Sequence, residues 1–477
     1  MADTNPGRYD IFSTLCKYLD PHLCYKLLEG EPDTPHEEQW FAFYSQESIS
    51  DARNAVLKKT NLLDCVIDDY EERDMEVPTE LTQQRDEIMT KLSQWSDSET
   101  GQLAIEFQNG DFDEALKARE SIKTIAKWCE IHLKTEDNPM PDKDQTVELL
   151  YDYMLFQYQC GDYAIVRCLA LKYVELIDGK EDAKPGRKLN ALWACFASSL
   201  LFSKWKEAID DCDRIEKELD STTHLKKSEI LLQKTWLLHW IMFIVFKPKL
   251  TPEGQIVEEE ERKEEKEKRA AMDRASEKLV ADGNKRIMTT AAPHLLRYLG
   301  ASLVLNPLKM GKHRREIVAL MSQEVYNHSD PIMDFLLALY MRIDFDEAQK
   351  HLGECKFIFD LDYFLQGKWE QFEDAARHSI FEAYCRIHQV IKIDMIAEKL
   401  SLTPEEAERW IVKLIQTAKL EAMIDSAKDQ VIMMRQAPNV YHQVMEKTRD
   451  LSLRSQVLYS HLDKVEEQNR KQKKEKA

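Results

Sequence analysis

A short pattern recurs at the start of successive amphipathic segments: an aromatic residue is followed three positions later by a small or apolar one. It occurs at residues 110–115 (GDFDEA), 161–166 (GDYAIV) and 204–208 (KWKEA), and again at 345–348 and 372–375. The steps from Phe112 to Tyr163 and from Tyr163 to Trp205 are 51 and 42 residues. This spacing is typical of stacked helical hairpins, in which each hairpin buries its apolar face only against its neighbours. We therefore predict an all-α solenoid of hairpins, similar to HEAT or TPR repeats.

A second interpretation stays open, in which unrelated helices each begin with an aromatic residue. The rest of the chain supports a helical fold in either case, since only 13 Gly and 15 Pro punctuate 477 residues. Apolar residues at helical spacing predict one longer helix over residues 49–72, and helices again from residue 284 onward.

Residues 393–435 have a different pattern, which predicts a small α+β winged helix. Thr403, Pro404 and Glu406 form the start of a helix with a capping box. Its predicted core side chains are Trp410, Ile411, Leu414 and Ile415. Two short alternating runs follow, separated by a polar turn near residues 428–429 and typical of a two-stranded ribbon.

The charge of this module argues against DNA recognition. Residues 393–435 contain six Lys or Arg and eight Asp or Glu, a net charge of −2, and the whole chain has a formal net charge of −20. A helix that binds duplex DNA needs a cationic excess to displace counterions. We therefore interpret the module as a protein-docking one. Its candidate contact is the strand edge at Val431, Ile432 and Met433, by extension of a sheet across a subunit boundary.

A final helix after Pro438 carries a narrow apolar seam with steps of three and four residues. Leu451, Leu458 and Leu462 in this seam are the candidate contacts of a bundle between subunits. Packing against the chain's own surface is the alternative. Two interpretations also stay open for the basic end at residues 469–477, a solvated tail or a segment that contacts RNA.

Residues 252–269 interrupt the helical pattern with almost pure charge. An exposed helix with paired charges and a disordered insertion both fit, and we favour a mobile insertion because no apolar residues are available to dock it. The expected divisions of the chain are helical repeats at 1–251, the charged insertion at 252–283, repeats of a second domain at 284–392, the winged helix at 393–436, and the C-terminal helix and tail at 437–477.

No catalytic or cofactor-binding motif is found. Gly311 and Lys312 lack the preceding glycine of a phosphate-binding loop, and no glycine-rich nucleotide loop or nucleophile elbow occurs. His378, Cys385 and His388 can share a helix face, but such a set is more typical of core and rim residues than of a metal site. We therefore expect no enzymatic activity, no cofactor and no metal. Scattered cysteines and the absence of a signal peptide predict a cytoplasmic protein without a membrane segment.

Helical hairpins followed by a winged helix and a terminal helix resemble the PCI family of scaffold subunits. Six strings, in the same order along the chain, further resemble the e-subunit family of eukaryotic translation initiation factor 3. They lie at residues 155–161 (LFQYQCG), 235–240 (TWLLHW), 293–299 (PHLLRYL), 381–389 (FEAYCRIHQ), 402–411 (LTPEEAERWI) and 451–458 (LSLRSQVL).

This resemblance implies a non-catalytic scaffold subunit that helps to assemble the factor on the small ribosomal subunit, where initiator ternary complex and mRNA are recruited. It also implies winged helices aligned edge to edge, a shared bundle of C-terminal helices, subunits c, d and l as partners, and at most indirect contact with mRNA. The alternative is a PCI scaffold subunit of the proteasome lid or the COP9 signalosome, because fold alone does not separate these assemblies.

Overall fold

The structure is a computed structural model. It describes residues 9–29, 41, 44–73, 75–96, 143–177, 186–222, 225–248, 259–388, 390–393, 409, 411–412, 422–425, 430–433 and 440–475. The chain divides into two compact units, residues 1–376 and 377–477, which are described separately below. The helix start predicted at Phe112 from the repeated aromatic pattern lies outside the described residues.

The first unit begins with a group of short helices. They are α2 (Phe12–Leu15), α3 (Pro21–Glu29), α4 (Gln46–Leu57), α5 (Leu63–Glu72) and α6 (Thr79–Ser96). Ser45 caps α4 by accepting a hydrogen bond from the Ser48 amide. Buried side chains of α4, α5 and α6 form a common core, namely Leu57, Leu63, Val66 and Leu81.

The single helix expected over residues 49–72 is therefore wrong, because the chain breaks between α4 and α5. The Asn61 amide in this break donates a hydrogen bond to the Gln159 carbonyl, 3.2 Å away, at the end of another helix. This contact across about a hundred residues holds the break together with the Thr60 hydroxyl, which donates to the Leu57 carbonyl and accepts from the Leu62 amide.

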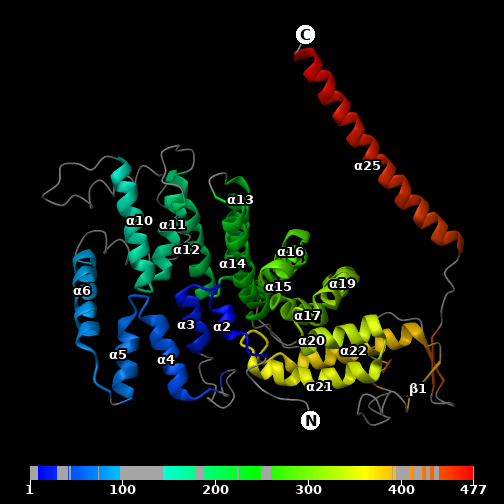
Figure 1. The fold of residues 1–477 in the computed structure, drawn as a ribbon, viewed down its shortest axis with the longest axis horizontal. Coiled ribbons are helices and arrows are strands. Elements are labelled where there is room, and N and C mark those ends of the chain that lie inside the picture. The colour runs from blue at the N-terminus through cyan, green and yellow to red at the C-terminus, as the bar shows by residue number, and fades with distance from the viewer. Residues whose placement is uncertain are drawn as a thin grey trace. The chain divides into compact units, whose positions relative to one another are not determined.

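Helices that pack side by side follow (Figure 1). They are α10 (Lys143–Gln159), α11 (Tyr163–Ile177), α12 (Arg187–Leu201), α13 (Trp205–Ser221) and α14 (Lys227–Phe246). Tyr163 and Trp205 are the first residues of α11 and α13, as the repeated pattern predicts. Gly161 adopts a positive φ of 89° in the tight turn before α11, a conformation that glycine reaches without strain.

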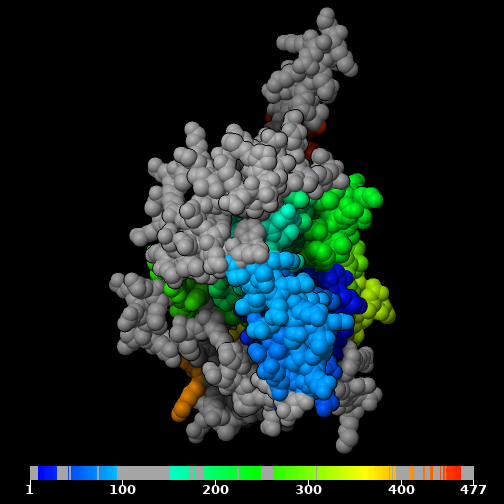
Figure 2. Space-filling model, turned by 90° about the vertical axis from the view of Figure 1, so that its left-hand side faces the viewer, coloured from blue at the N-terminus to red at the C-terminus, as the bar shows by residue number. Residues whose placement is uncertain are grey.

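The N-terminal helices pack against these hairpins, and Figure 2 shows them in blue beside the cyan and green helices of the same unit. Lys26 Nζ donates a hydrogen bond to the Leu201 carbonyl, 2.9 Å away. The rings of His22 and Tyr163 meet edge to face and share a hydrogen bond of 2.9 Å. Segments more than a hundred residues apart are therefore held together by polar contacts at the edge of the apolar core.

Helix α14 is long and apolar enough to cross a membrane by length and composition alone. In this fold it is a core helix, because every side chain from Leu237 to Phe246 is buried within the unit. A membrane-spanning helix and a core helix can have the same apolar composition, and burial inside the protein explains the composition of α14.

The charged stretch is helical from residue 259 onward, so the expected mobile insertion is wrong for residues 259–269, which form the alternative, an exposed helix with paired charges. Helix α15 (Glu259–Val280) packs against α13 and α14. Its second half buries Ala271, Ala275 and Leu279, which lie beyond the charged run. Arg274 and Lys278 pair with an acidic face of α13 formed by Asp210, Asp213 and Glu216. Small apolar side chains and opposite charge therefore dock a helix whose first half is almost entirely charged.

Shorter helices complete the first unit and lead out of it. They are α16 (Asp282–Thr290), α17 (Leu295–Leu305), α18 (Pro307–Met310), η2 (Gly311–His313), α19 (Arg314–Glu324), α20 (Pro331–Leu337), η3 (Ala338–Arg342), α21 (Phe345–Leu361) and α22 (Trp369–Ile387). Phe345 opens α21 as predicted, whereas Phe372 lies one turn inside α22. Phe372 is fully buried against Phe335 and Phe359.

A buried charged cluster joins three parts of this region. The Arg297 side chain pairs with Asp330 at 2.6 Å and with Asp362 at 3.1 Å. Arg297 also donates to the Tyr9 carbonyl at 2.8 Å, and Tyr298 donates to Asp362 at 2.9 Å. These hydrogen bonds compensate the cost of removing the charges from water.

The second unit contains a three-stranded antiparallel sheet and a long terminal helix. The strands are β1 (Val390–Lys392), β2 (Ala422–Asp425) and β3 (Gln430–Met433), in the order β1-β3-β2. The sheet therefore has one strand more than the expected ribbon, and it begins at residue 390, before the expected boundary at 393. Helix α25 spans Val440–Glu475. Trp410, Leu414 and Ile415 lie outside the described residues, and Ile411 is fully buried.

Candidate docking surfaces of the C-terminal unit

One face of the small sheet is its buried side. The register places Ile391 and Ile424 on either side of Val431. Ile391 and Val431 are fully buried, and Ile424 is half-buried. Alternation along each strand therefore directs these three side chains into the apolar interior of the unit.

The opposite face carries an apolar row that crosses all three strands, Val390, Ile432 and Met423, named here the sheet row. Val390 pairs with Ile432 and Ile432 with Met423, so the three side chains are neighbours. Val390 is 51% exposed and Met423 is 50% exposed. Of this row, the sequence predicted a contact only for Ile432. The exposure of Met423 could have been predicted, because it alternates with Ala422 and Ile424 along the strand. Val390 could not, because the sequence did not predict the strand to which it belongs.

The proposed strand edge at Val431–Met433 is wrong as an edge. Strand β3 is central and pairs with β1 on one side and with β2 on the other. Its backbone donors and acceptors are thus engaged in two ladders, and a further strand cannot add to it. Among the described strands the outer ones are β1 and β2. A role of Val431, Ile432 and Met433 in protein binding stays a prediction, without the strand-edge mechanism.

The seam of α25 is exposed along the described helix. Leu451, Leu458 and Leu462 are 62%, 65% and 57% exposed, and Val444 is exposed as well. Among the described residues of the second unit nothing covers these side chains, and packing against the chain's own surface stays the alternative to a bundle. Large apolar side chains at helical spacing are expected to be covered in a working protein.

The apolar stripe on α25 is broader than the predicted seam. Tyr441, Met445 and Tyr459 are exposed and lie along one flank of the line from Val444 to Leu462. Together with that line they cover roughly 140° of the helix circumference, at about 100° per residue. A two-stranded coiled coil needs only a narrow seam, whereas a stripe of this width fits a helix that packs against more than one neighbour. The sequence analysis counted residues at four-three spacing only, and the tyrosine and methionine positions beside them would have indicated the wider stripe.

These surfaces offer packing, and they show no group arranged for chemistry. Burial raises the pKa of the Cys385 thiol to about 12, which keeps this group protonated and unreactive. Within the described ranges, no group of three or more His, Cys, Asp or Glu side chains is placed to hold a metal ion.

Comparison with known proteins agrees with this arrangement. The family model described as the PCI domain matches residues 348–435, from α21 to the sheet. The model described as the eIF3 subunit 6 N terminal domain matches residues 10–157. The matched residues contain the last helices of the first unit and the small sheet, so the chain is a PCI-domain protein. This confirms the predicted fold class.

Relatives over nearly the whole length then give the family. The E subunit of eukaryotic translation initiation factor 3 from Caenorhabditis elegans is 31% identical over 464 residues, 96% of this chain and 97% of that protein. The Brugia malayi protein of the same name is 32% identical over 466 residues, covering 96% of this chain and 95% of that protein. The Arabidopsis thaliana protein is 30% identical over 467 residues, covering 95% and 96%.

The chain therefore belongs to the E-subunit family of eukaryotic translation initiation factor 3. This membership favours translation initiation over the proteasome lid or the signalosome, the alternative that the PCI architecture had left open.

Proposed function

We propose that this protein is a scaffold subunit that works by docking other subunits of initiation factor 3, without catalysis of its own. The observation that carries this proposal is the exposed apolar stripe on α25, which includes Leu451, Leu458 and Leu462. An exposed stripe of this kind marks a protein interface, because water contact with large apolar side chains costs free energy that a partner helix recovers. Bundling with C-terminal helices of other subunits is the corresponding assembly.

The sheet supplies the second docking surface. Alignment of PCI winged helices edge to edge would use β1 or β2, the outer strands of the described sheet, with the sheet row of Val390, Ile432 and Met423 beside that edge. Main-chain hydrogen bonds would then contribute affinity and the apolar row would contribute specificity.

The partners that we propose are subunits c, d and l of the factor and, through the assembled factor, the small ribosomal subunit in the cytoplasm. Contact with mRNA is indirect in this proposal. The net charge of −20 supports it, because phosphate binding needs a cationic excess that this chain lacks as a whole.

The experiment is a pull-down of the tagged full-length protein from cytosolic lysate, followed by a density gradient and mass spectrometry. We expect co-migration with other initiation factor 3 subunits and with the small ribosomal subunit. Co-migration with other factor subunits but never with ribosomal proteins would contradict the ribosomal part. Migration as a free chain would overturn the scaffold role.

A further inference from the structure

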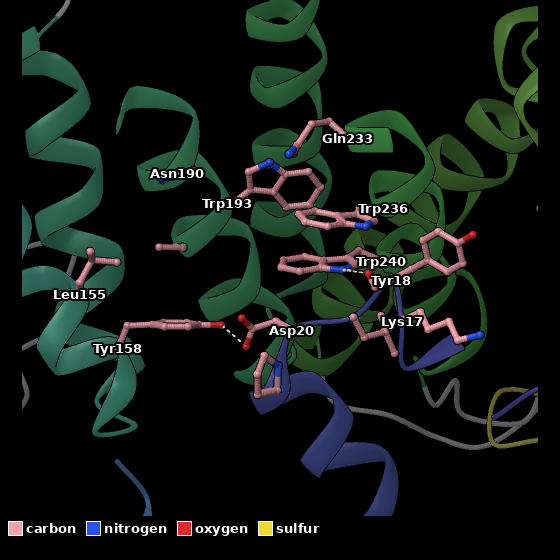
Figure 3. A pocket seen from close by; sticks show the side chains of 13 residues that line it. Lys17, Tyr18, Asp20, Leu155, Tyr158, Asn190, Trp193, Gln233, Trp236 and Trp240 are labelled. Carbon is pink, nitrogen blue, oxygen red and sulfur yellow. Dashed lines mark hydrogen bonds between the residues drawn. The ribbon is translucent and has the colours of Figure 1, made fainter. Parts of the chain in front are cut away.

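A cavity of about 330 Å³ opens in the first unit, far along the sequence from the sheet and α25. It lies between α10, α12, α14 and the N-terminal segment Lys17–Pro21 (Figure 3). Three indoles line it, those of Trp193, Trp236 and Trp240, together with the phenol ring of Tyr158. Its volume is within the range of cavities that bind small groups.

The walls of this cavity are held in place by their own contacts. The Trp240 indole donates a hydrogen bond to the Tyr18 carbonyl at 3.1 Å. The Trp193 ring meets Trp240 edge to face, with 4.6 Å between ring centroids and 73° between their planes. The Tyr158 hydroxyl donates to Asp20 Oδ1 at 2.9 Å. A cavity whose walls are already ordered loses little entropy when a ligand enters.

Asp20 gives the cavity its charge. Its Oδ1 atom accepts from the Tyr158 hydroxyl and from the His22 amide, both at 2.9 Å. Lys17 is the only cationic residue of the lining, and its exposed side chain points away from the indoles (Figure 3). The interior therefore combines electron-rich ring faces with one carboxylate, which attracts a cation and repels a phosphate.

Two further polar atoms belong to the wall beside Trp236. Trp193 is 9% exposed, and its Nε1 atom has no hydrogen-bond partner among the described residues. The same holds for the buried Oε1 atom of Gln233. Both atoms are closed to solvent, so they belong to the packed wall of the cavity and are not offered to a ligand.

We propose that this cavity binds an arginine side chain presented by a partner polypeptide. A planar guanidinium stacks on an indole face, and its five N–H donors suit the carboxylate oxygens of Asp20. A lysine ammonium is more strongly hydrated and has no planar face to stack. This site is independent of the docking surfaces in the C-terminal unit.

A titration of the full-length protein followed by tryptophan fluorescence tests this inference. The probes are the acetylated and amidated peptide Gly-Ser-Arg-Ser-Gly and its citrulline analogue, which has nearly the same shape and no charge. We expect saturable binding of the arginine peptide, at least about tenfold weaker binding of the citrulline peptide, and weakening of the first by salt.

Three variants locate the site. Asp20→Asn keeps the Oδ1 acceptor of the wall and removes the charge, so it should weaken arginine-peptide binding about tenfold without lowering the melting temperature. Trp236→Ala removes the most accessible indole and should weaken binding similarly. Asp51→Asn, at an exposed acidic residue of α4, is the matched control and should bind as the original protein does.

Three results would overturn the inference. The first is equal binding of the arginine and citrulline peptides, or no binding of either. The second is full binding by Asp20→Asn. The third is saturable binding of an oligouridine RNA that Trp236→Ala abolishes, because the cavity would then accept a nucleobase.

Discussion

At the scale of single residues, buried charge decides how the helices of the first unit hold together. Arg297 is almost fully buried and reaches Asp330, Asp362 and the Tyr9 carbonyl. Local propensity predicts nothing of this cluster, because its members come from segments up to 288 residues apart. Two carboxylates without their cation would be costly to keep in the interior.

The first prediction concerns that cation. Arg297→Leu leaves Asp330 and Asp362 without their partner and should lower the free energy of unfolding by about 3–5 kcal/mol. The measurement is urea unfolding followed by tryptophan fluorescence. Arg85→Leu is the control, because the Arg85–Asp64 pair is exposed and its loss should change the free energy of unfolding far less. Equal losses in both variants would contradict the role assigned to burial.

The second prediction concerns two buried histidines. The Nε2 atoms of His239 and His294 lie 2.8 Å apart. Burial lowers the pKa of His239 to about 4 and, with the neighbouring ring, that of His294 to about 3. The unfolded chain has a histidine pKa of about 6.5, so it binds protons more readily than the folded one below that pH. Their contribution to stability is therefore complete above pH ~6.5 and falls as the pH is lowered toward about 4.

Melting temperatures between pH 7.5 and 5 check this sign. Burial raises the pKa of Asp362, which acts in the opposite direction, so the comparison with a variant isolates the histidines. The double variant His239→Gln and His294→Gln should show a smaller loss on acidification than the original protein. Parallel curves for the two proteins would refute the assignment.

At the scale of elements, two predictions from the sequence were wrong. The charged part of α15 was expected to be mobile, and β3 was expected to be an edge strand. The first half of α15 is charged, and its docking residues Ala271, Ala275 and Leu279 follow the charged run. The alternation of apolar residues in β3 fits an edge strand and a central strand equally well, and its pairing with β1 makes it central. Both differences have the same origin, since an element's neighbours decide which of its faces is covered.

The third prediction tests the docking of α15. Leu279→Ala removes a fully buried side chain and should cost about 2–5 kcal/mol, with faster amide hydrogen exchange over residues 259–280. Glu264→Gln removes an exposed charge paired with Lys268 and should change stability by only a few tenths of a kcal/mol. Unchanged exchange in Leu279→Ala would show that the helix is not held by this contact.

The fourth prediction tests the stripe on α25. The double variant Leu458→Glu and Leu462→Glu should lose the other factor subunits in a pull-down while keeping its melting temperature, because both side chains are exposed within the chain itself. Ser460→Glu and His461→Glu add the same charge on the side of the helix away from the stripe and should assemble normally. Assembly of the leucine variant at the original yield would remove the stripe from the proposed interface.

At the scale of the whole molecule, net charge limits what the chain binds. The formal charge of −20 belongs to the chain as a whole, and the basic end at 469–477 is short. Screening at physiological salt limits each charge to its own neighbourhood, and acidic residues outnumber basic ones over most of the chain, so we expect little attraction for phosphate.

The fifth prediction follows from this charge. The purified full-length protein should pass through a heparin column at about 0.15 M salt, where the screening length is about 8 Å, and should bind an anion exchanger. Retention on heparin would contradict it, and a chain without residues 469–477 would then show whether the basic end is responsible.

The sequence by itself determined the local properties of this protein. Helix starts at Tyr163, Trp205 and Phe345 were predictable because an amphipathic period and the residues at a helix start act within one or two turns. The likeness of six strings to one family was equally readable, and the relatives confirm it. The seam of α25 was visible in the four-three spacing of apolar residues, and the segment is a helix as that spacing predicts.

Only the tertiary structure decided which segments meet. The break before Leu63, the docking of α15, the central place of β3 and the cavity around Trp236 all depend on contacts between residues far apart in the chain. Such contacts cost loop-closure entropy and return burial energy, and that balance depends on every competing partner at once. A local pattern therefore predicts what an element can bury, and the assembled fold selects what covers it.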